Sequence, residues 1–272
     1  MIILIFFALG LIVGSFLNVA VYRLRVAESL VVGRSHCPHC KAMIAWYDNI
    51  PVISFILLKF KCRKCRAKIS WQYPLVEIFT GLVFALVGSQ YFNLNDTASW
   101  ATAIYYMGIV SFLMVIFVYD FLYMEIPGLA LWPAIGWAVA FNLFFDWAGL
   151  KGGVGGQGGI GVLESSVYSG VLGAFVAFML FFLMVAVSKE KWMGMGDAYL
   201  VILLGLILGW PQILLGLMLA FSIGAIFGIV MIVAKKKKMG SQIPFAPFLV
   251  LGSFLALFWY DWIISWYMGL FF

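Results

Sequence analysis

The stretch SVYSGVLGAFVAFMLFFLMVAV, residues 166–187, contains no charged side chain. A membrane-spanning helix needs about 20 mostly apolar residues, so this stretch is long enough to cross a bilayer. The whole chain has the same character, because its 272 residues are 65% hydrophobic and only 10% charged, with a mean hydropathy of +1.09. Soluble domains carry about a quarter charged residues. The composition therefore excludes an ordinary soluble domain and predicts an all-α polytopic membrane protein.

Eight apolar segments of roughly this length follow one another along the chain. The sixth is short, and Gly209, Trp210 and Pro211 separate it from the seventh. The segments are 2–22, 75–92, 100–119, 128–145, 166–187, 198–210, 212–234 and 245–268. We therefore expect about eight transmembrane helices.

Basic residues are concentrated in alternate connections between these segments. With the N-terminus outside, the connections 23–74, 120–127, 188–197 and 235–244 face the cytoplasm and hold 16 of the 17 Lys and Arg residues. Such a bias is typical of cytoplasmic loops. It explains the net charge of +6 without nucleic-acid binding, and membrane lipids are the expected partners of these clusters.

The first connection is the only one large enough to form a small domain. We expect residues 1–22 to form transmembrane helix one, 23–74 a cytoplasmic domain, and 75–272 a membrane helix bundle. The first segment lacks the basic start of a signal peptide, so we expect it to be retained. The apolar stretch 50–58 is too short to span, and we expect it to pack on the domain or to enter the membrane interface.

All four cysteines lie in this domain, as two Cys-x-x-Cys pairs. Cys37 with Cys40, and Cys62 with Cys65, can each place two sulfurs on one turn, and two such turns complete a tetrahedral zinc site. A domain this small has little core of its own, so a structural metal would stabilise it. The reducing cytoplasm disfavours disulfides. We favour zinc over the alternative of a redox centre, which needs only one pair.

Two histidines and a glycine-rich connection have several interpretations. His36 and His39 are alternative metal ligands, or they support the ligands from outside or are simply exposed. The connection 149–161 contains six glycines between positions 152 and 159, and we interpret it as a flexible external linker rather than a phosphate-binding loop.

Two aspartates stand at predicted membrane boundaries on the same side. Asp120 ends the third segment, and Asp197 follows Gly194 and Gly196, whose backbone freedom would allow a tight turn and a close approach. Singly, each aspartate has an ordinary explanation, a solvated loop residue for Asp120 and a helix N-cap for Asp197. Together they are the parts of an aspartyl protease, in which one ionised carboxylate activates water and one neutral carboxyl polarises the scissile carbonyl.

Helix ends suggest how these two roles divide. Asp197 lies at a predicted helix N-terminus, where partial positive charge favours the ionised form, and Asp120 lies at a C-terminus, where that form is disfavoured. We therefore predict that Asp197 is the resting base and Asp120 the resting acid.

Taken in order, the motifs of this chain resemble those of the prepilin peptidase family, also called type IV leader peptidases, which are GxGD-type intramembrane aspartyl proteases. The motifs are Gly14-Ser15-Phe16-Leu17-Asn18-Val19, Tyr22-Arg23-Leu24, Cys37-Pro38-His39-Cys40, Asn49-Ile50-Pro51-Val52, Cys62-Arg63-Lys64-Cys65, Tyr73-Pro74-Leu75-Val76-Glu77, Asp120 with Ile126-Pro127, Gly194-Met195-Gly196-Asp197, and Pro244-Phe245-Ala246-Pro247-Phe248. The resemblance covers nearly the whole chain.

The resemblance implies that Asp120 and Asp197 are the catalytic pair, with Gly194 and Gly196 in the active-site loop. It implies a prepilin or pseudopilin substrate, with a short basic leader ending in glycine before an apolar helix. Cleavage would occur at the cytoplasmic face of the bacterial inner membrane, in type IV pilus assembly or protein secretion. Many members with the cysteine domain also methylate the new N-terminus with S-adenosylmethionine. The resemblance leaves this second activity open, because the residues indicate no pocket for the cofactor.

Two positions depart from the pattern of the family. Tyr199 stands where the family commonly has lysine, and Gly128 stands where it often has an acidic or amide residue. Both departures bear on substrate preference and positioning. Glu125 is a further hypothesis, since its charge could attract a basic leader, the alternative being an exposed charge of no consequence.

Two other classes of protein are alternatives. An ion- or proton-coupled transporter would place its carboxylates near the middle of the bilayer and often shows an inverted repeat, and neither feature is evident in the sequence. A non-enzymatic pilus or secretion assembly platform would use the zinc domain to bind partners.

Overall fold

The structure is a computed structural model, and it describes residues 1–30, 33–150, 165–191, 193–234 and 243–270. Within these residues the chain is helical, with two isolated β-bridges and no strand. Seven helices are long and apolar enough to cross a membrane, and α7 is a shorter apolar helix. The predicted all-α polytopic fold is therefore confirmed, with seven long helices and one short helix for the eight segments. The glycine-rich linker and the lysine run of the last connection lie almost wholly outside the described residues.

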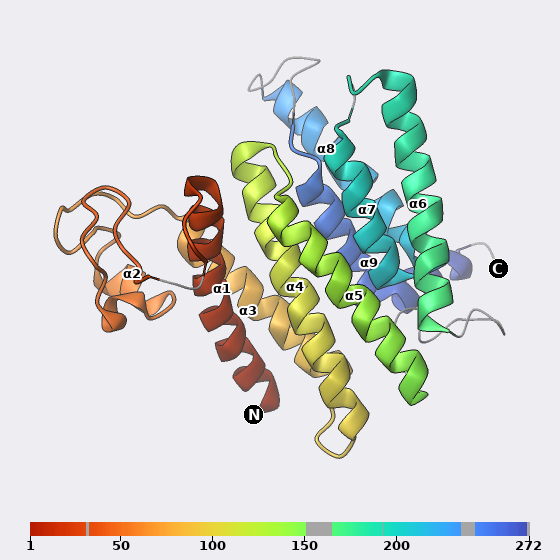
Figure 1. The fold of residues 1–272 in the computed structure, drawn as a ribbon, viewed down its shortest axis with the longest axis horizontal. Coiled ribbons are helices and arrows are strands. Elements are labelled where there is room, and N and C mark those ends of the chain that lie inside the picture. Colours follow the sequence, from red (N-terminus) through yellow and green to blue (C-terminus); the bar gives the residue numbers. More distant parts are fainter. Residues whose placement is uncertain (31–32, 151–164, 192, 235–242, 271–272) are drawn as a thin grey trace. The chain divides into compact units, whose positions relative to one another are not determined.

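The chain divides into two compact units, Met1–Val118 and Tyr119–Phe272. The first unit contains α1 (Ile2–Val26), the 3-10 turn η1 (Trp46–Asn49), α2 (Ile53–Leu57), α3 (Gln72–Tyr91) and most of α4 (Thr97–Tyr123). Within this unit α1 and α3 lie side by side, and the segment that connects them gathers beside α1 (Figure 1). The helices α1 and α4 each continue a turn beyond their predicted ends.

Glycines allow α1 and α3 to approach closely. A Cβ atom on Gly10 would lie 2.7 Å from the backbone of α3, and a Cβ atom on Gly14 would lie 2.8 Å from the Cα of Glu77. Neither position has room for a side chain, which is the close packing that glycine permits between membrane helices. The same approach lets the Asn18 Nδ2 group donate a hydrogen bond of 3.1 Å to the Tyr73 carbonyl.

The short helix α2 belongs to the connecting segment and does not enter the helix pair. Its Phe55 is buried, with ring centroids 4.8 Å from Phe60 and 5.1 Å from Trp71. Of the two predictions for the apolar stretch 50–58, packing on its own domain is present at Phe55, and entry into the membrane interface stays a prediction.

The second unit contains the last turn of α4 and five further helices. They are α5 (Gly128–Ala148), α6 (Ser166–Ser188), α7 (Met195–Leu208), α8 (Gln212–Val233) and α9 (Ala246–Gly269). The helix α7 contacts the other four and buries most of its side chains. Its 14 residues span about 21 Å, less than the roughly 30 Å of a hydrocarbon core. Neighbouring helices rather than lipid therefore surround α7.

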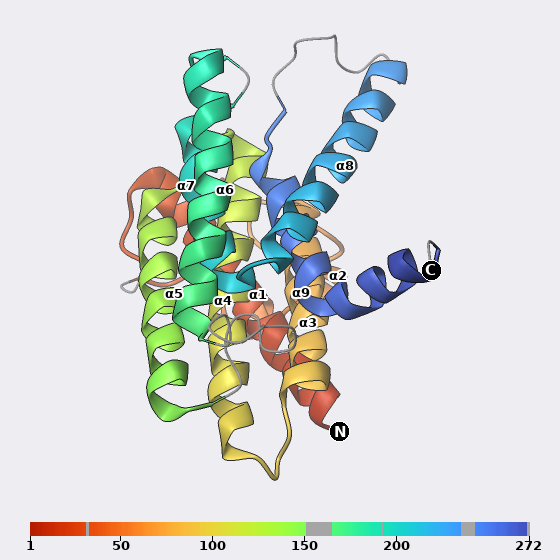
Figure 2. The same cartoon turned by 90° about the vertical axis from the view of Figure 1, so that its right-hand side faces the viewer.

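The break between α7 and α8 falls where the sequence predicts it. Gly209 has a left-handed φ of 69°, the Trp210–Pro211 peptide is cis, and the Trp210 N–H donates to the Ser169 hydroxyl of α6 at 3.1 Å. One turn earlier, a Cβ atom on Gly205 would collide with the backbone of α6. Figure 2 shows α9 changing direction along its length, and its dihedral angles leave the helical region at Trp259.

Candidate functional site

The four cysteines lie on two matching turns in the first unit. In each turn the first cysteine donates its N–H to the carbonyl five residues ahead, and its own carbonyl accepts from the N–H four residues ahead. The bonds are Cys37 to Ala42 (3.0 Å), Lys41 to Cys37 (2.8 Å), Cys62 to Ala67 (2.8 Å) and Arg66 to Cys62 (3.0 Å). The sequence Cys-x-x-Cys-(Lys/Arg)-Ala therefore folds in the same way twice.

These two turns bring the four sulfurs together. All four Sγ atoms lie within 4.8 Å of one another, and those of Cys37 and Cys65 are 3.9 Å apart. A tetrahedral zinc site with Zn–S bonds of about 2.3 Å separates its sulfurs by about 3.8 Å. The cysteines are free thiols rather than disulfides. The arrangement therefore has the ligand type and spacing of a four-cysteine metal site.

The electrostatics of the cluster also suit a cation. The backbone N–H groups of Cys65 and Lys64 lower the pKa of the Cys62 thiol to about 7. Four thiolates this close would repel one another, and a divalent cation removes that repulsion. Neither predicted alternative ligand belongs to the cluster: the ring of His36 lies edge-on to Tyr22 at 5.8 Å, and His39 is exposed.

The two aspartates lie in the second unit, at neighbouring helix ends. Asp120 is in the last turn of α4 and only 5% exposed, and Asp197 is in the first turn of α7 and half-buried. Their carboxyl groups are close enough for a Coulombic interaction. Neither ordinary explanation holds, because Asp120 is a buried helical residue, and Gly194, not Asp197, is the N-cap of α7, with no side-chain capping bond.

The N-terminus of α9 meets the first aspartate. The backbone N–H of Ala246 donates to the Asp120 carboxyl group, whose Oδ2 atom has no partner among the described residues. Asp120 therefore lies near the positive end of α9 as well as the negative end of α4. The prediction that Asp197 is the base and Asp120 the acid considered only the negative end of α4 beside Asp120. The division of roles therefore stays a prediction. Ala246 belongs to one of the motifs that resemble the family, but the sequence did not predict its contact with Asp120.

The short connection between α4 and α5 contacts the second aspartate motif. Met124 takes a left-handed φ of 55° and ends α4, and the side chain of Ile126 lies 3.4 Å from where a Cβ atom of Gly196 would stand. The close approach expected of Gly196 is present at ordinary van der Waals distance. The tight turn expected of Gly194 is not, because its φ of −79° and ψ of 157° suit any residue.

The two departures from the family pattern share a neighbour, Trp132 of α5. The ring of Tyr199 lies 5.8 Å from the ring of Trp132, and a Cβ atom on Gly128 would lie 3.6 Å from the same indole. An aromatic pair therefore stands two residues along α7 from Asp197, at the position where the family commonly has a positive charge.

Comparisons with known proteins bear directly on this arrangement. The family description "Bacterial Peptidase A24 N-terminal domain" matches residues 8–91, and "Type IV leader peptidase family" matches residues 107–229. A "Prepilin leader peptidase/N-methyltransferase" from Aeromonas salmonicida (strain A449) is 31% identical over 288 residues, covering 97% of this chain and 92% of that protein. The chain belongs to the type IV leader peptidase family.

Two further relatives of this leader peptidase carry the same name. The protein from Stutzerimonas stutzeri is 30% identical over 283 residues, covering 96% of this chain and 91% of its own length. The protein from Myxococcus xanthus (strain DK1622) is 34% identical over 239 residues, covering 84% of this chain and 62% of its own length. No solved structure matches the chain.

The two family matches cover different parts of the chain, and each part contains one of the two candidate sites. The first covers α1, the cysteine turns and α3, and the second covers both aspartates. Together with the seven long apolar helices, membership of the family makes the chain an integral membrane protein.

Proposed function

We propose that this protein is a membrane-embedded aspartyl endopeptidase that removes the short leader of prepilin-like proteins at the cytoplasmic face of the bacterial inner membrane. The observation that carries the proposal is the placement of Asp120 and Asp197 at helix ends within the second unit, close enough for a Coulombic interaction. Their position at the ends of helices suits a substrate that presents its leader at the membrane surface. The charge bias of the connections supports the cytoplasmic side.

The carboxyl pair supplies the acid and the base that peptide hydrolysis needs. The ionised group takes a proton from water, whose oxygen attacks the scissile carbonyl while the neutral group donates a proton to the carbonyl oxygen. Collapse of this intermediate breaks the C–N bond, and the amine leaves with a proton from the pair. We assign the resting base to Asp197 and the acid to Asp120, whose carboxyl group the Ala246 N–H holds in place.

Residues 23–74 form the metal-stabilised part of the protein, and residues 75–272 contain the protease site. Cys37, Cys40, Cys62 and Cys65 would hold zinc, which contributes to folding rather than to hydrolysis. The names of the relatives join the peptidase to an N-methyltransferase. We therefore extend the proposal to methylation of the newly exposed N-terminus, with S-adenosylmethionine as the methyl donor.

The test is co-expression with a candidate prepilin, followed by mass measurement of the N-terminus of the product. Loss of the leader and gain of one methyl group are the expected results, and Asp120→Asn and Asp197→Asn proteins should leave the leader attached. Retained cleavage in the doubly substituted protein would reject the protease and favour the assembly platform. The transporter alternative is not favoured, since the chain belongs to a peptidase family.

A further inference from the structure

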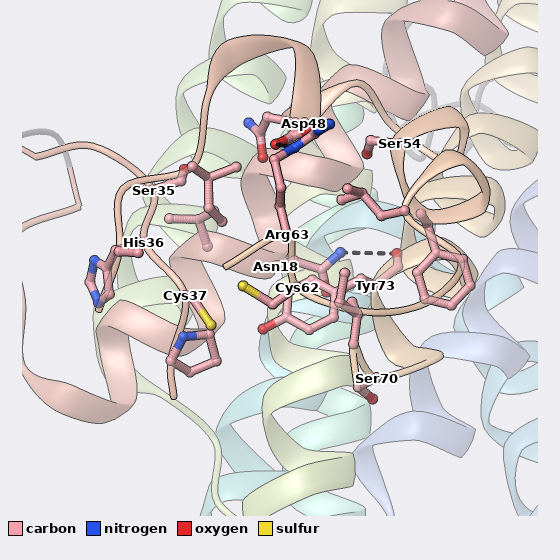
Figure 3. A pocket seen from close by; sticks show the side chains of 18 of the residues that line it. Asn18, Ser35, His36, Cys37, Asp48, Ser54, Cys62, Arg63, Ser70 and Tyr73 are labelled. Carbon is pink, nitrogen blue, oxygen red and sulfur yellow. Dashed lines mark hydrogen bonds and ion pairs between the residues drawn. The ribbon is translucent and has the colours of Figure 1, made fainter. Parts of the chain in front are cut away.

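A cavity of about 460 Å³ lies in the first unit, beside the cysteine turns (Figure 3). It is bounded by the C-terminal half of α1, the connecting segment and the start of α3. Asn18, Tyr22, Tyr47, Tyr73 and Glu77 contribute to its walls. Its volume falls within the range of about 300–1,000 Å³ that is usual for small-molecule sites, and its walls combine aromatic surface with polar and charged side chains.

One polar atom at this cavity is buried and has no partner. Asn18 is 2% exposed, and its Nδ2 group donates to the Gly14 carbonyl at 3.2 Å and the Tyr73 carbonyl at 3.1 Å. These two bonds orient the amide, and Figure 3 shows the second of them. The Oδ1 atom is left without a donor among the described residues. Because buried polar groups are normally hydrogen-bonded, this acceptor is suited to an N–H or O–H group of a ligand.

A carboxylate from the facing helix supplies a second acceptor. Glu77 is 7% exposed, accepts a bond of 2.8 Å from the Val52 N–H, and also bonds to the Ser15 side chain. These donors are neutral, so they orient the carboxylate without neutralising its charge. A buried negative charge of this kind favours a cationic ligand or one with several hydroxyl groups.

The two arginines at the cavity are occupied elsewhere. Arg23 donates to the Gly33 carbonyl at 2.8 Å, and Arg63 forms an ion pair of 2.6 Å with Asp48. Lys64 and Lys68 also line the cavity, so it presents positive charge as well as the carboxylate of Glu77.

We propose that this cavity binds S-adenosylmethionine, with Asn18 Oδ1 and Glu77 accepting hydrogen bonds from its amino or hydroxyl groups and the tyrosine rings covering its apolar parts. This inference rests on the methyltransferase activity proposed above. The ligand combines an aromatic base, ribose hydroxyls, two positive centres and a carboxylate. Aromatic walls, two acceptors, the carboxylate of Glu77 and the lysines of the lining are suited to these groups. When bound, it supplies a methyl group: its C–S bond breaks with the electron pair left on sulfur, a C–N bond forms to a neutral amine, and water takes the proton of that amine.

The test measures binding directly on the full-length, zinc-loaded protein in lipid nanodiscs. Equilibrium dialysis with radiolabelled S-adenosylmethionine should show saturable binding that unlabelled S-adenosylhomocysteine displaces. Glu77→Gln and Asn18→Leu should each weaken binding about tenfold or more, since each removes a buried hydrogen-bond acceptor. Zinc content and the midpoint temperature of unfolding identify any variant that fails to fold. Tyr47→Leu, in a partly exposed wall, provides a third variant that leaves α1 and α3 unchanged.

Matched substitutions away from the cavity serve as controls. Glu28→Gln and Asn95→Leu make the same chemical changes at exposed positions and should leave the dissociation constant unchanged. Absence of saturable binding, or binding that Glu77→Gln and Tyr47→Leu leave intact, would overturn the inference. Displacement by a synthetic basic leader peptide but not by S-adenosylhomocysteine would also overturn it and would assign the cavity to the substrate.

Failure of this inference is distinguishable from failure of the peptidase proposal. Asp120→Asn should abolish leader cleavage and leave binding of S-adenosylmethionine unchanged. A wild-type protein that cleaves but does not bind the methyl donor rejects the inference alone. A wild-type protein that binds it but does not cleave rejects the peptidase alone.

Discussion

The cysteine cluster and the aspartate pair are assembled in opposite ways. The cluster is made by two copies of one short turn, each closed by hydrogen bonds between residues four or five positions apart. The aspartates come from two helices far apart in the sequence, and a third helix, α9, contacts one of them. The first site therefore depends on local turns and a metal, and the second depends on how helices pack. Perturbing each kind of interaction separately should affect one site and spare the other.

The largest expected effect is on the aspartate pair. Asp120→Asn or Asp197→Asn should lower the rate of leader cleavage by at least about a hundredfold, because each removes a proton-transfer group. Zinc content should stay at the wild-type value, since the cysteine turns are in the other unit. Initial rates on a purified prepilin measure the effect, and Asp96→Asn, an exposed aspartate, is the matched control. A single variant that keeps more than a tenth of the wild-type rate contradicts the assignment.

Removal of the metal should affect the other site. Cys37→Ser and Cys62→Ser should each reduce bound zinc from about one ion per chain to near zero, because a structural site needs all four ligands. Limited proteolysis should then cut the connecting segment, which has little core of its own, while α5–α9 stay protected. His39→Ala should retain zinc. Loss of zinc in that variant would indicate that His39 is a zinc ligand.

A packing substitution should break the aspartate pair without touching the cysteines. Gly205→Val places a side chain where the backbone of α6 already lies, so it should cost about 1–3 kcal/mol or more and displace α7. Cleavage should fall and the inactivation temperature should drop, with zinc content unchanged. Gly228→Val is the control, since a Cβ atom there meets nothing within 4 Å. Equal effects of the two substitutions would argue against packing as the cause.

A smaller effect is expected at Glu125, which is exposed in the connection after α4. Glu125→Gln should raise KM for a basic-leader substrate a few-fold at low salt, because it removes an attractive charge, and the difference should disappear at high salt. A substrate with a neutral leader is the control. An unchanged KM at low salt would leave Glu125 as an exposed charge without a role.

The smallest effect concerns an ion pair beside the cysteine turns. Bonds from Arg63 hold the pKa of Asp48 below its ordinary value. The stability that ionised Asp48 contributes is therefore fully present at pH values above the ordinary pKa of an aspartate. It is lost as the pH falls through the lowered pKa of the folded state. Asp48→Asn should cause only a slight destabilisation near neutral pH, because exposed pairs contribute little. Thermal unfolding across the acid range should show the difference from wild type vanishing at low pH, and a constant difference would contradict this account.

Several features of the second unit could not be predicted from the sequence. Apolar length predicted α7, and the turn signal of Gly209, Trp210 and Pro211 predicted the break before α8. The burial of α7 among four helices follows from their packing. The N-cap explanation for Asp197 was wrong because α7 begins two residues earlier than the aspartate. Asp120 was expected to end its helix, and α4 continues to Tyr123. Apolar length predicts that a helix exists better than it predicts where the helix ends.

By itself, the sequence determined the membrane class, the number of apolar helices, and the two turns that hold the cysteines. Apolar length and ligand spacing are local properties, so residues near one another in the chain are sufficient to specify them. Only the tertiary structure decided that Ala246 contacts Asp120, that Tyr199 lies against Trp132, and that Asn18 and Glu77 border one cavity. Those contacts depend on how closely separate helices approach. Glycines, which have no side chain, set this distance as much as the larger side chains that pack between the helices.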